Sequence, residues 1–157
     1  MPAPGGAITR TVLFYVPEEF SSYRMRKKKG LHTYEYNLGP AVSRGLLDLM
    51  RGTFHRVEER PVAGRTAEQL TQPDSAFDYV GVPSFANATY KVGLVNMGPS
   101  AEVAVVFVGR DGRRLTVAGS GKRGSAFAPD HDTLATKVVR DVLTAIRDDL
   151  ERQRESF

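Results

Sequence analysis

The chain has 157 residues, of which 41% are hydrophobic and 25% charged, the size and composition of one globular domain. It contains no cysteine, which excludes disulfides, thiolate metal sites and cysteine nucleophiles. No apolar run approaches the ~18 residues needed to cross a bilayer, and the opening MPAPGG lacks the charged start and apolar core of a signal peptide. We therefore expect a flexible leader over residues 1–8 and a single α+β domain over residues 9–157.

The positive charge of the chain is concentrated in one short run. Twenty-two Lys and Arg residues against 18 Asp and Glu residues give a formal net charge of +4. Residues 24–29 (RMRKKK) supply five of these cations, so the rest of the chain carries a net charge of −1. A local patch of this kind favours contact with an anionic partner such as a lipid headgroup, a polysaccharide or a nucleic acid.

The first part of the chain predicts two strands and a helix. Residues 9–16 (TRTVLFYV) are rich in β-branched and aromatic side chains and predict a strand that ends at Pro17. Residues 18–30, which include the basic run, predict a polar loop. Residues 31–36 (LHTYEY) predict a second strand with Tyr34 and Tyr36 on one side, together with His32. The helix opens at Gly39-Pro40 and ends at Gly52; its apolar face has the spacing of a buried stripe, with Val42, Gly45, Leu46, Leu49 and Met50.

The second part predicts further strands and a long final helix. Residues 54–60 (FHRVEER), 77–82 (FDYVGV) and 90–95 (YKVGLV) predict strands, and residues 61–75 predict a polar loop. Residues 101–108 and 113–118 flank Asp111-Gly112, which tolerates the positive φ of a tight hairpin turn. A helix over about residues 132–152, capped by Asp132 or Thr133, closes the chain. The apolar stripe of this helix contains Leu134, Val138, Val142, Ala145 and Ile146.

This order of elements predicts an α+β fold: a mixed, mostly antiparallel sheet with two helices packed on one face. The open edge strands of such a sheet would allow a homo-oligomer to form.

Motifs that suggest catalysis have structural explanations. Residues 119–124 (GSGKRG) match GxGxxG, but Pro129 intervenes before the next helix, and no later strand completes a dinucleotide-binding unit. We interpret this segment as a flexible loop. Asp130-His131-Asp132 has the composition of a helix start, where carboxylates satisfy free N–H groups. Adjacent carboxylate pairs such as Glu58-Glu59 point in different directions. We therefore predict that the chain is not an enzyme, has no catalytic residues, and binds no cofactor or metal.

The cationic residues are the best candidates for function. The anion- or partner-binding set is Arg24, Arg26, Lys27, Lys28, Lys29, Lys122 and Arg123. Tyr23, Tyr34 and Tyr36 lie close by in sequence, and aromatic rings beside cations suit sugar stacking or single-stranded nucleic acid. A solvated loop with no ligand is the structural alternative. Two functions stay open: a binding protein for anionic glycans or lipid headgroups, and a basic nucleic-acid-binding module.

The pattern and order of several segments resemble a known group of proteins. These segments are Leu38-Gly39-Pro40-Ala41 before a short helix, Phe54-His55-Arg56-Val57, residues 77–83, the strand over residues 101–108, the Asp111-Gly112 turn, Gly119-Ser120-Gly121 and the final helix. Together they resemble small bacterial cell-envelope lipoproteins. That group includes the lipopolysaccharide-assembly lipoprotein, the Pel exopolysaccharide-export lipoprotein and the N-terminal domain of TolB.

The resemblance implies a non-catalytic periplasmic domain that serves an envelope assembly, export or transport machine as one subunit of a protein complex. It also implies a tether to the outer membrane through a lipidated cysteine. Because the chain has no cysteine, this interpretation requires that a signal peptide and the lipidated residue have been removed, with Pro2–Gly6 left as a linker.

Overall fold

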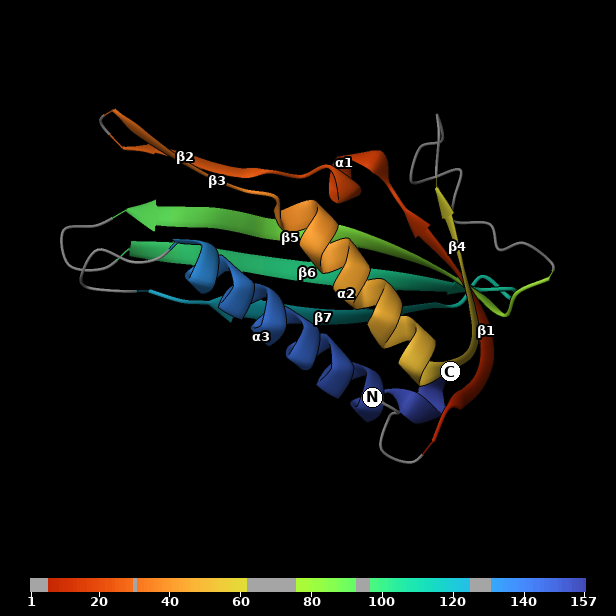
Figure 1. Cartoon of the computed structure of the whole chain (residues 1–157). Helices are drawn as coiled ribbons and strands as arrows, with labels where there is room; N and C mark the ends of the chain where they lie inside the picture. Colours follow the sequence, from red (N-terminus) through yellow and green to blue (C-terminus); the bar gives the residue numbers. More distant parts are fainter. Residues whose placement is uncertain (1–5, 30, 62–75, 93–96, 125–130) are drawn as a thin grey trace.

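A computed structural model describes residues 6–29, 31–61, 76–92, 97–124 and 131–157. Figure 1 shows two layers, in which helices α2 and α3 cross one face of a five-stranded sheet. The elements are β1 (Ile8–Val16), α1 (Glu18–Ser21), β2 (Met25–Lys29), β3 (His32–Tyr36), α2 (Leu38–Thr53), β4 (Phe54–Pro61), β5 (Tyr79–Val92), β6 (Met97–Gly109), β7 (Arg114–Lys122), α3 (His131–Arg152) and the 3-10 turn η2 (Arg154–Ser156). The predicted α+β class is confirmed.

The sheet has the order β4-β1-β5-β6-β7, and β2 and β3 form a separate two-stranded sheet. Strand β1 is parallel to both β4 and β5, whereas β5, β6 and β7 form an antiparallel meander. Parallel strands need a long crossover, and the chain between β1 and β4 supplies it with the β2–β3 hairpin and α2. The sheet is therefore mixed, as the order of elements predicted.

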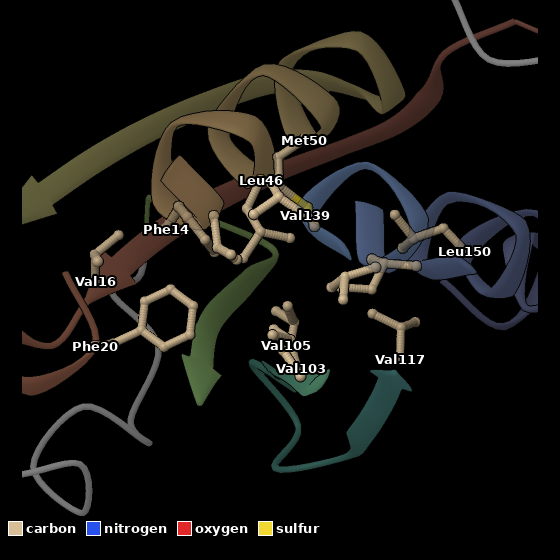
Figure 2. Packing of buried hydrophobic residues seen from close by; sticks show 14 of the residues in the cluster. Phe14, Val16, Phe20, Leu46, Met50, Val103, Val105, Val117, Val139 and Leu150 are labelled. Atoms are coloured by element: carbon tan, nitrogen blue, oxygen red, sulfur yellow. The ribbon is translucent and has the colours of Figure 1, made fainter. Parts of the chain in front are cut away.

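The core lies between the sheet and the two long helices. The predicted stripe of α2 is buried at Val42, Leu46 and Met50, which are completely inaccessible to solvent. Figure 2 shows Leu46 and Met50 of α2 packed in one cluster with Val139 and Leu150 of α3. Val138, Val142 and Ile146 of α3 belong to the same cluster. The sheet side of this core comes from Phe14, Val103, Val105, Phe107 and Val117. The predicted apolar face of α2 is confirmed at Val42, Leu46 and Met50, and that of α3 at Val138, Val142 and Ile146. Leu134 and Ala145 of the predicted α3 stripe are only partly buried.

The last residue of the chain also belongs to the core. The ring of Phe157 lies edge-on to those of Phe54, Tyr79 and Phe107. Arg10 donates a hydrogen bond from Nε to the backbone oxygen of Phe157, at 3.1 Å. These contacts join the end of the chain to β1, β4, β5 and β6.

Two predictions about local structure are wrong. The polar loop expected over residues 18–30 contains α1 and strand β2, because the basic run pairs residue by residue with β3. The strands expected over residues 77–82 and 90–95 are one strand, β5, which pairs with β6 along its whole length and has an irregularity between Phe85 and Asn87. Residues 93–95 of the second expected strand lie outside the described residues. So does most of the loop expected over residues 61–75.

The predicted cap of the last helix also needs correction. Helix α3 begins at His131, so Asp132 and Thr133 lie inside its first turn and neither is the cap. Among the described residues, no helix has the length and apolar character needed to span a bilayer.

The amino end of β1 and the tip of the β2–β3 hairpin lie at opposite ends of the sheet (Figure 1). Val12 of β1 is opposite Tyr79, the first residue of β5, and the two strands run in the same direction. Tyr34 of the hairpin stacks on Tyr90, close to the last residue of β5, with ring centroids 5.8 Å apart. The length of β5 therefore separates the two ends.

Candidate anion-binding hairpin

Four of the seven predicted site residues, Arg26, Lys27, Lys28 and Lys29, lie on strand β2 of the β2–β3 hairpin, and Arg24 lies just before it. The strands pair antiparallel, with Met25 opposite Tyr36, Lys27 opposite Tyr34 and Lys29 opposite His32. Residues on paired strands alternate between the two faces of the ribbon. Met25, Lys27, Tyr34 and Tyr36 therefore share one face, and Arg26, Lys28 and Glu35 share the other. The predicted common side of Tyr34 and Tyr36 is confirmed.

The hairpin is held against the body of the protein by its apolar face. Met25 is only 4% exposed and belongs to the main core. Tyr34, Tyr36 and Met25 line a small cavity together with Tyr90 of β5 and Ala135 of α3. Burial raises the pKa of Tyr90, and the neighbouring Tyr34 raises it further. The aromatic residues next to the basic run therefore pack the hairpin against the sheet and fix its direction.

The cations of the run differ in their electrostatic partners. Arg24 lies 3.2 Å and Arg26 3.4 Å from the two carboxylate oxygens of Glu35, so these guanidinium groups share one counter-charge. Lys27 and Lys28 are exposed, and no ion pair within the described part of the chain involves either of them. The backbone of Lys29 belongs to β2. The positive charge available to an outside ligand is therefore greatest at Lys27 and Lys28, on the tip side of Glu35.

A hydrophobic side chain lies at the tip, next to these lysines. Leu31 is 100% exposed, and among the described residues it is the one large hydrophobic side chain with high exposure. The sequence analysis included Leu31 in a strand, but β3 begins at His32 and Leu31 belongs to the turn. In the alternation LHTYEY, Leu31 falls on the opposite face from Tyr34, which packs on the sheet. This pattern could have identified Leu31 as an exposed hydrophobic residue.

The other two predicted site residues lie elsewhere and do not join the hairpin. Lys122 and Arg123 are at the end of β7, and the sheet order places β6 between β7 and the strand on which the hairpin packs. Arg123 donates from Nε and Nη2 to the two carboxylate oxygens of Asp141 on α3, at 2.7 and 3.0 Å. These hydrogen bonds lower the pKa of Asp141 and raise that of Arg123. Arg123 thus connects a strand to a helix.

The GxGxxG segment is a place of close packing between β7 and α3. A Cβ atom on Gly119 would lie 2.5 Å from the backbone oxygen of Val142, and one on Gly121 would lie 2.7 Å from that of Val138. Both distances are far below van der Waals contact. The flexible loop predicted here is wrong for residues 119–122, which belong to β7. The glycines bring the helix backbone close to the strand, which explains the motif without a phosphate.

A groove runs between the two long helices, away from the hairpin. It has a volume of about 400 Å³. Leu49 of α2 and Val139 and Leu143 of α3 form its apolar part, and Arg140 and Arg147 lie on its α3 side.

Comparison with known proteins identifies the fold. No family model and no curated protein matches the sequence. The structure is similar to that of protein XCC0632 from Xanthomonas campestris, described as family DUF330, with 14% identity, a TM-score of 0.56, and coverage of 99% of this chain and 94% of that one. It is also similar to hypothetical protein CT253 from Chlamydia trachomatis, with 8% identity, a TM-score of 0.51, and coverage of 90% and 98%.

A looser similarity links the chain to PelC from Paraburkholderia phytofirmans, solved as a dodecamer, with 15% identity, a TM-score of 0.48 and 94% coverage of each chain. At that TM-score the similarity has no bearing on how this chain assembles. The similarities to XCC0632 and CT253, at 14% and 8% identity, establish a shared fold.

Proposed function

We propose that this chain is a non-catalytic accessory protein of the bacterial cell envelope, whose β2–β3 hairpin binds an anionic glycan or lipid headgroup. The observation that carries this proposal is the contrast within the basic run. Glu35 occupies Arg24 and Arg26, whereas Lys27 and Lys28 face solvent from a strand that is packed on the sheet. The two lysines lie on opposite faces of the ribbon near its tip. Cations held in fixed positions attract anions and orient them, which a mobile basic loop does less well.

The carboxylates with lowered pKa values support binding over catalysis. Asp78 accepts hydrogen bonds from the backbone N–H and hydroxyl of Thr11, and these bonds lower its pKa. Arg154 lowers the pKa of Glu151 in the same way, at 2.9 and 3.0 Å. The Asp78 bonds join β1 to the chain just before β5, and the Glu151 bonds close the turn that follows α3. Perturbed groups that act in catalysis would instead converge on a common cavity.

The location in the envelope rests on the sequence resemblance to envelope lipoproteins. In this proposal the chain is periplasmic and tethered to the outer membrane. A protein partner of the export or assembly machine would bind the groove between α2 and α3, whose apolar part is formed by Leu49, Val139 and Leu143.

The test of anion binding compares two polymers across a salt series. Alginate supplies uronate groups, single-stranded DNA supplies phosphates and bases, and both are titrated by fluorescence anisotropy or calorimetry. We expect alginate binding that weakens with salt and is lost in the double variant Lys27→Gln/Lys28→Gln. Much tighter binding of DNA at equal salt would favour the nucleic-acid-binding function. No binding of either polymer, together with a cytosolic location of the gene product in cell fractionation, would overturn the proposal.

A further inference from the structure

The tip of the β2–β3 hairpin combines two features that a soluble anionic polymer does not use together. Lys27 and Lys28 offer positive charge, and Leu31 beside them exposes its whole side chain to water. We infer that this tip docks on an anionic lipid bilayer, with Leu31 inserted at the interface and the lysines on the lipid headgroups. The inference rests on the proposed anion-binding function and narrows it to a membrane surface.

The exposure of Leu31 is the observation that separates a bilayer from a glycan. A polysaccharide or nucleic acid attracts the lysines through its charge but offers no apolar interior in which a leucine side chain could be buried. A bilayer offers both, since binding to its interface increases with buried apolar area and with attraction to anionic lipids. The fold does not need Leu31 where it is, because the hairpin is held by Met25, Tyr34 and Tyr36 on its other end and face.

The geometry of the hairpin makes the tip accessible to a flat surface. The hairpin runs beside β5 and reaches the end of the molecule farthest from the chain termini (Figure 1). The stacking of Tyr34 on Tyr90 holds the hairpin near the last residue of β5. Leu31 therefore lies beyond the point where the hairpin is packed on the sheet. Glu35, the acidic residue of the hairpin, lies on the base side and pairs with Arg24 and Arg26. A membrane approached by the tip therefore meets the leucine and the two exposed lysines before it meets the carboxylate.

Vesicle flotation with purified protein tests the inference. Phosphatidylcholine vesicles with and without phosphatidylglycerol are compared for the wild type, Leu31→Ser and Lys27→Gln/Lys28→Gln. We expect binding only to the anionic vesicles, a loss of about fivefold for each lysine removed, and a loss of roughly tenfold for Leu31→Ser at unchanged charge. Leu31→Phe should retain binding, because it keeps an apolar side chain at the tip.

Two controls make the result specific. Arg44→Gln/Lys137→Gln removes two exposed cations from α2 and α3 and should leave vesicle binding within a factor of two, expected for charges away from the surface contact. Alginate binding is measured in parallel and should be the same for Leu31→Ser as for the wild type.

If Leu31→Ser binds vesicles as well as the wild type does, the inference is wrong, and intact alginate binding would then leave the proposed function standing. If neither vesicles nor alginate bind, both fail.

Discussion

Arg123, at the end of β7, donates two hydrogen bonds to the carboxylate of Asp141 on α3, at 2.7 and 3.0 Å. The pair joins the last strand of the sheet to the helix that covers it, at the place where the glycines of β7 let that helix approach most closely. A residue that the sequence suggested as an anion-binding cation is therefore occupied by a carboxylate of its own chain.

This pair predicts a pH dependence of stability. The hydrogen bonds from Arg123 lower the pKa of Asp141, so folding favours its ionised form. The stabilisation is present above the ordinary pKa of about 3.9 and is lost as the pH falls through the lowered value of the folded state. Urea unfolding should therefore show Asp141→Asn to be less stable than the wild type at pH 7, with the difference shrinking in acid. An equal loss of stability for Asp141→Asn at pH 7 and in acid would contradict this assignment.

The packing of Phe157 in the core predicts a large loss of stability when its ring is removed. Its ring centroid lies 5.3 Å from Phe54, 5.3 Å from Tyr79 and 5.1 Å from Phe107. Removal of a buried phenylalanine ring leaves a cavity, so Phe157→Ala should lower the free energy of unfolding by about 3 kcal/mol. Phe157→Leu fills part of the space and should lower the free energy of unfolding by about 1 kcal/mol. Denaturant titration measures both, and an alanine variant as stable as the leucine variant would show that the ring contributes little.

Gly119 predicts a steric limit on the contact between β7 and α3. A Cβ at this position would lie 2.5 Å from the backbone oxygen of Val142 and 2.8 Å from Ile146, so Gly119→Ala must displace the helix. We expect a loss of about 2 kcal/mol in the free energy of unfolding. Ser120→Ala is the matched control, because Ser120 is on the same strand, exposed, and directed away from the helix. Thermal unfolding of the two variants should differ clearly; equal midpoints would refute the close-packing explanation of the glycine motif.

The edge of β7 predicts a change in association. The carboxylate of Asp149 accepts a hydrogen bond from the backbone N–H of Ala118 at 2.9 Å, and Gln153 donates from Nε2 to the carbonyl of Thr116 at 2.9 Å. These side chains occupy backbone groups that an edge strand would offer to another chain. Asp149→Ala leaves the exposed N–H of Ala118 open to another chain and should raise self-association in light scattering.

Asp149→Asn keeps an acceptor oxygen and should associate less than the alanine variant. A fully monomeric alanine variant would mean that the edge is protected in another way.

Glu35 predicts a gain of function. Its carboxylate pairs with Arg24 and Arg26, and each pair is well exposed. Glu35→Gln removes one negative charge and frees both guanidinium groups, so anionic vesicles and alginate should bind more tightly and with a steeper salt dependence. The cost in stability should stay below about 1 kcal/mol, since exposed ion pairs contribute little. Weaker binding by Glu35→Gln would indicate that the two arginines need Glu35 to hold them in position.

The elements that the sequence predicted well are those whose burial is visible in the spacing of apolar residues. Val42, Leu46 and Met50 repeat with the period of a helix, and the β-branched residues of β1 have no competing interpretation as a helix. The turn at Gly112 was recognisable because its φ of +82° suits glycine, as Asp-Gly pairs indicate.

The errors occur where partners distant in sequence decide the structure. Lysine has a low preference for strands, yet Lys27 and Lys28 lie in β2 because Met25 anchors the strand in the core and β3 supplies its hydrogen-bond partners. Glycine also disfavours strands, yet Gly119 lies in β7 because α3 packs against it. The electrostatic role of Glu35 depends on the same pairing, since the register places it opposite Arg26.

The placement of the hairpin tip and the start of β1 at opposite ends has a mechanical consequence. A strand advances by about 3.3 Å per residue, so the 14 residues of β5 measure roughly 45 Å. A structure that binds the amino end of the domain is therefore kept at about the length of β5 from a structure that the hairpin tip contacts. A domain fixed at both ends would behave as a strut that sets the gap between two layers. Lengthening or shortening the chain before Ile8 would change that gap, while the contacts of the tip would stay the same.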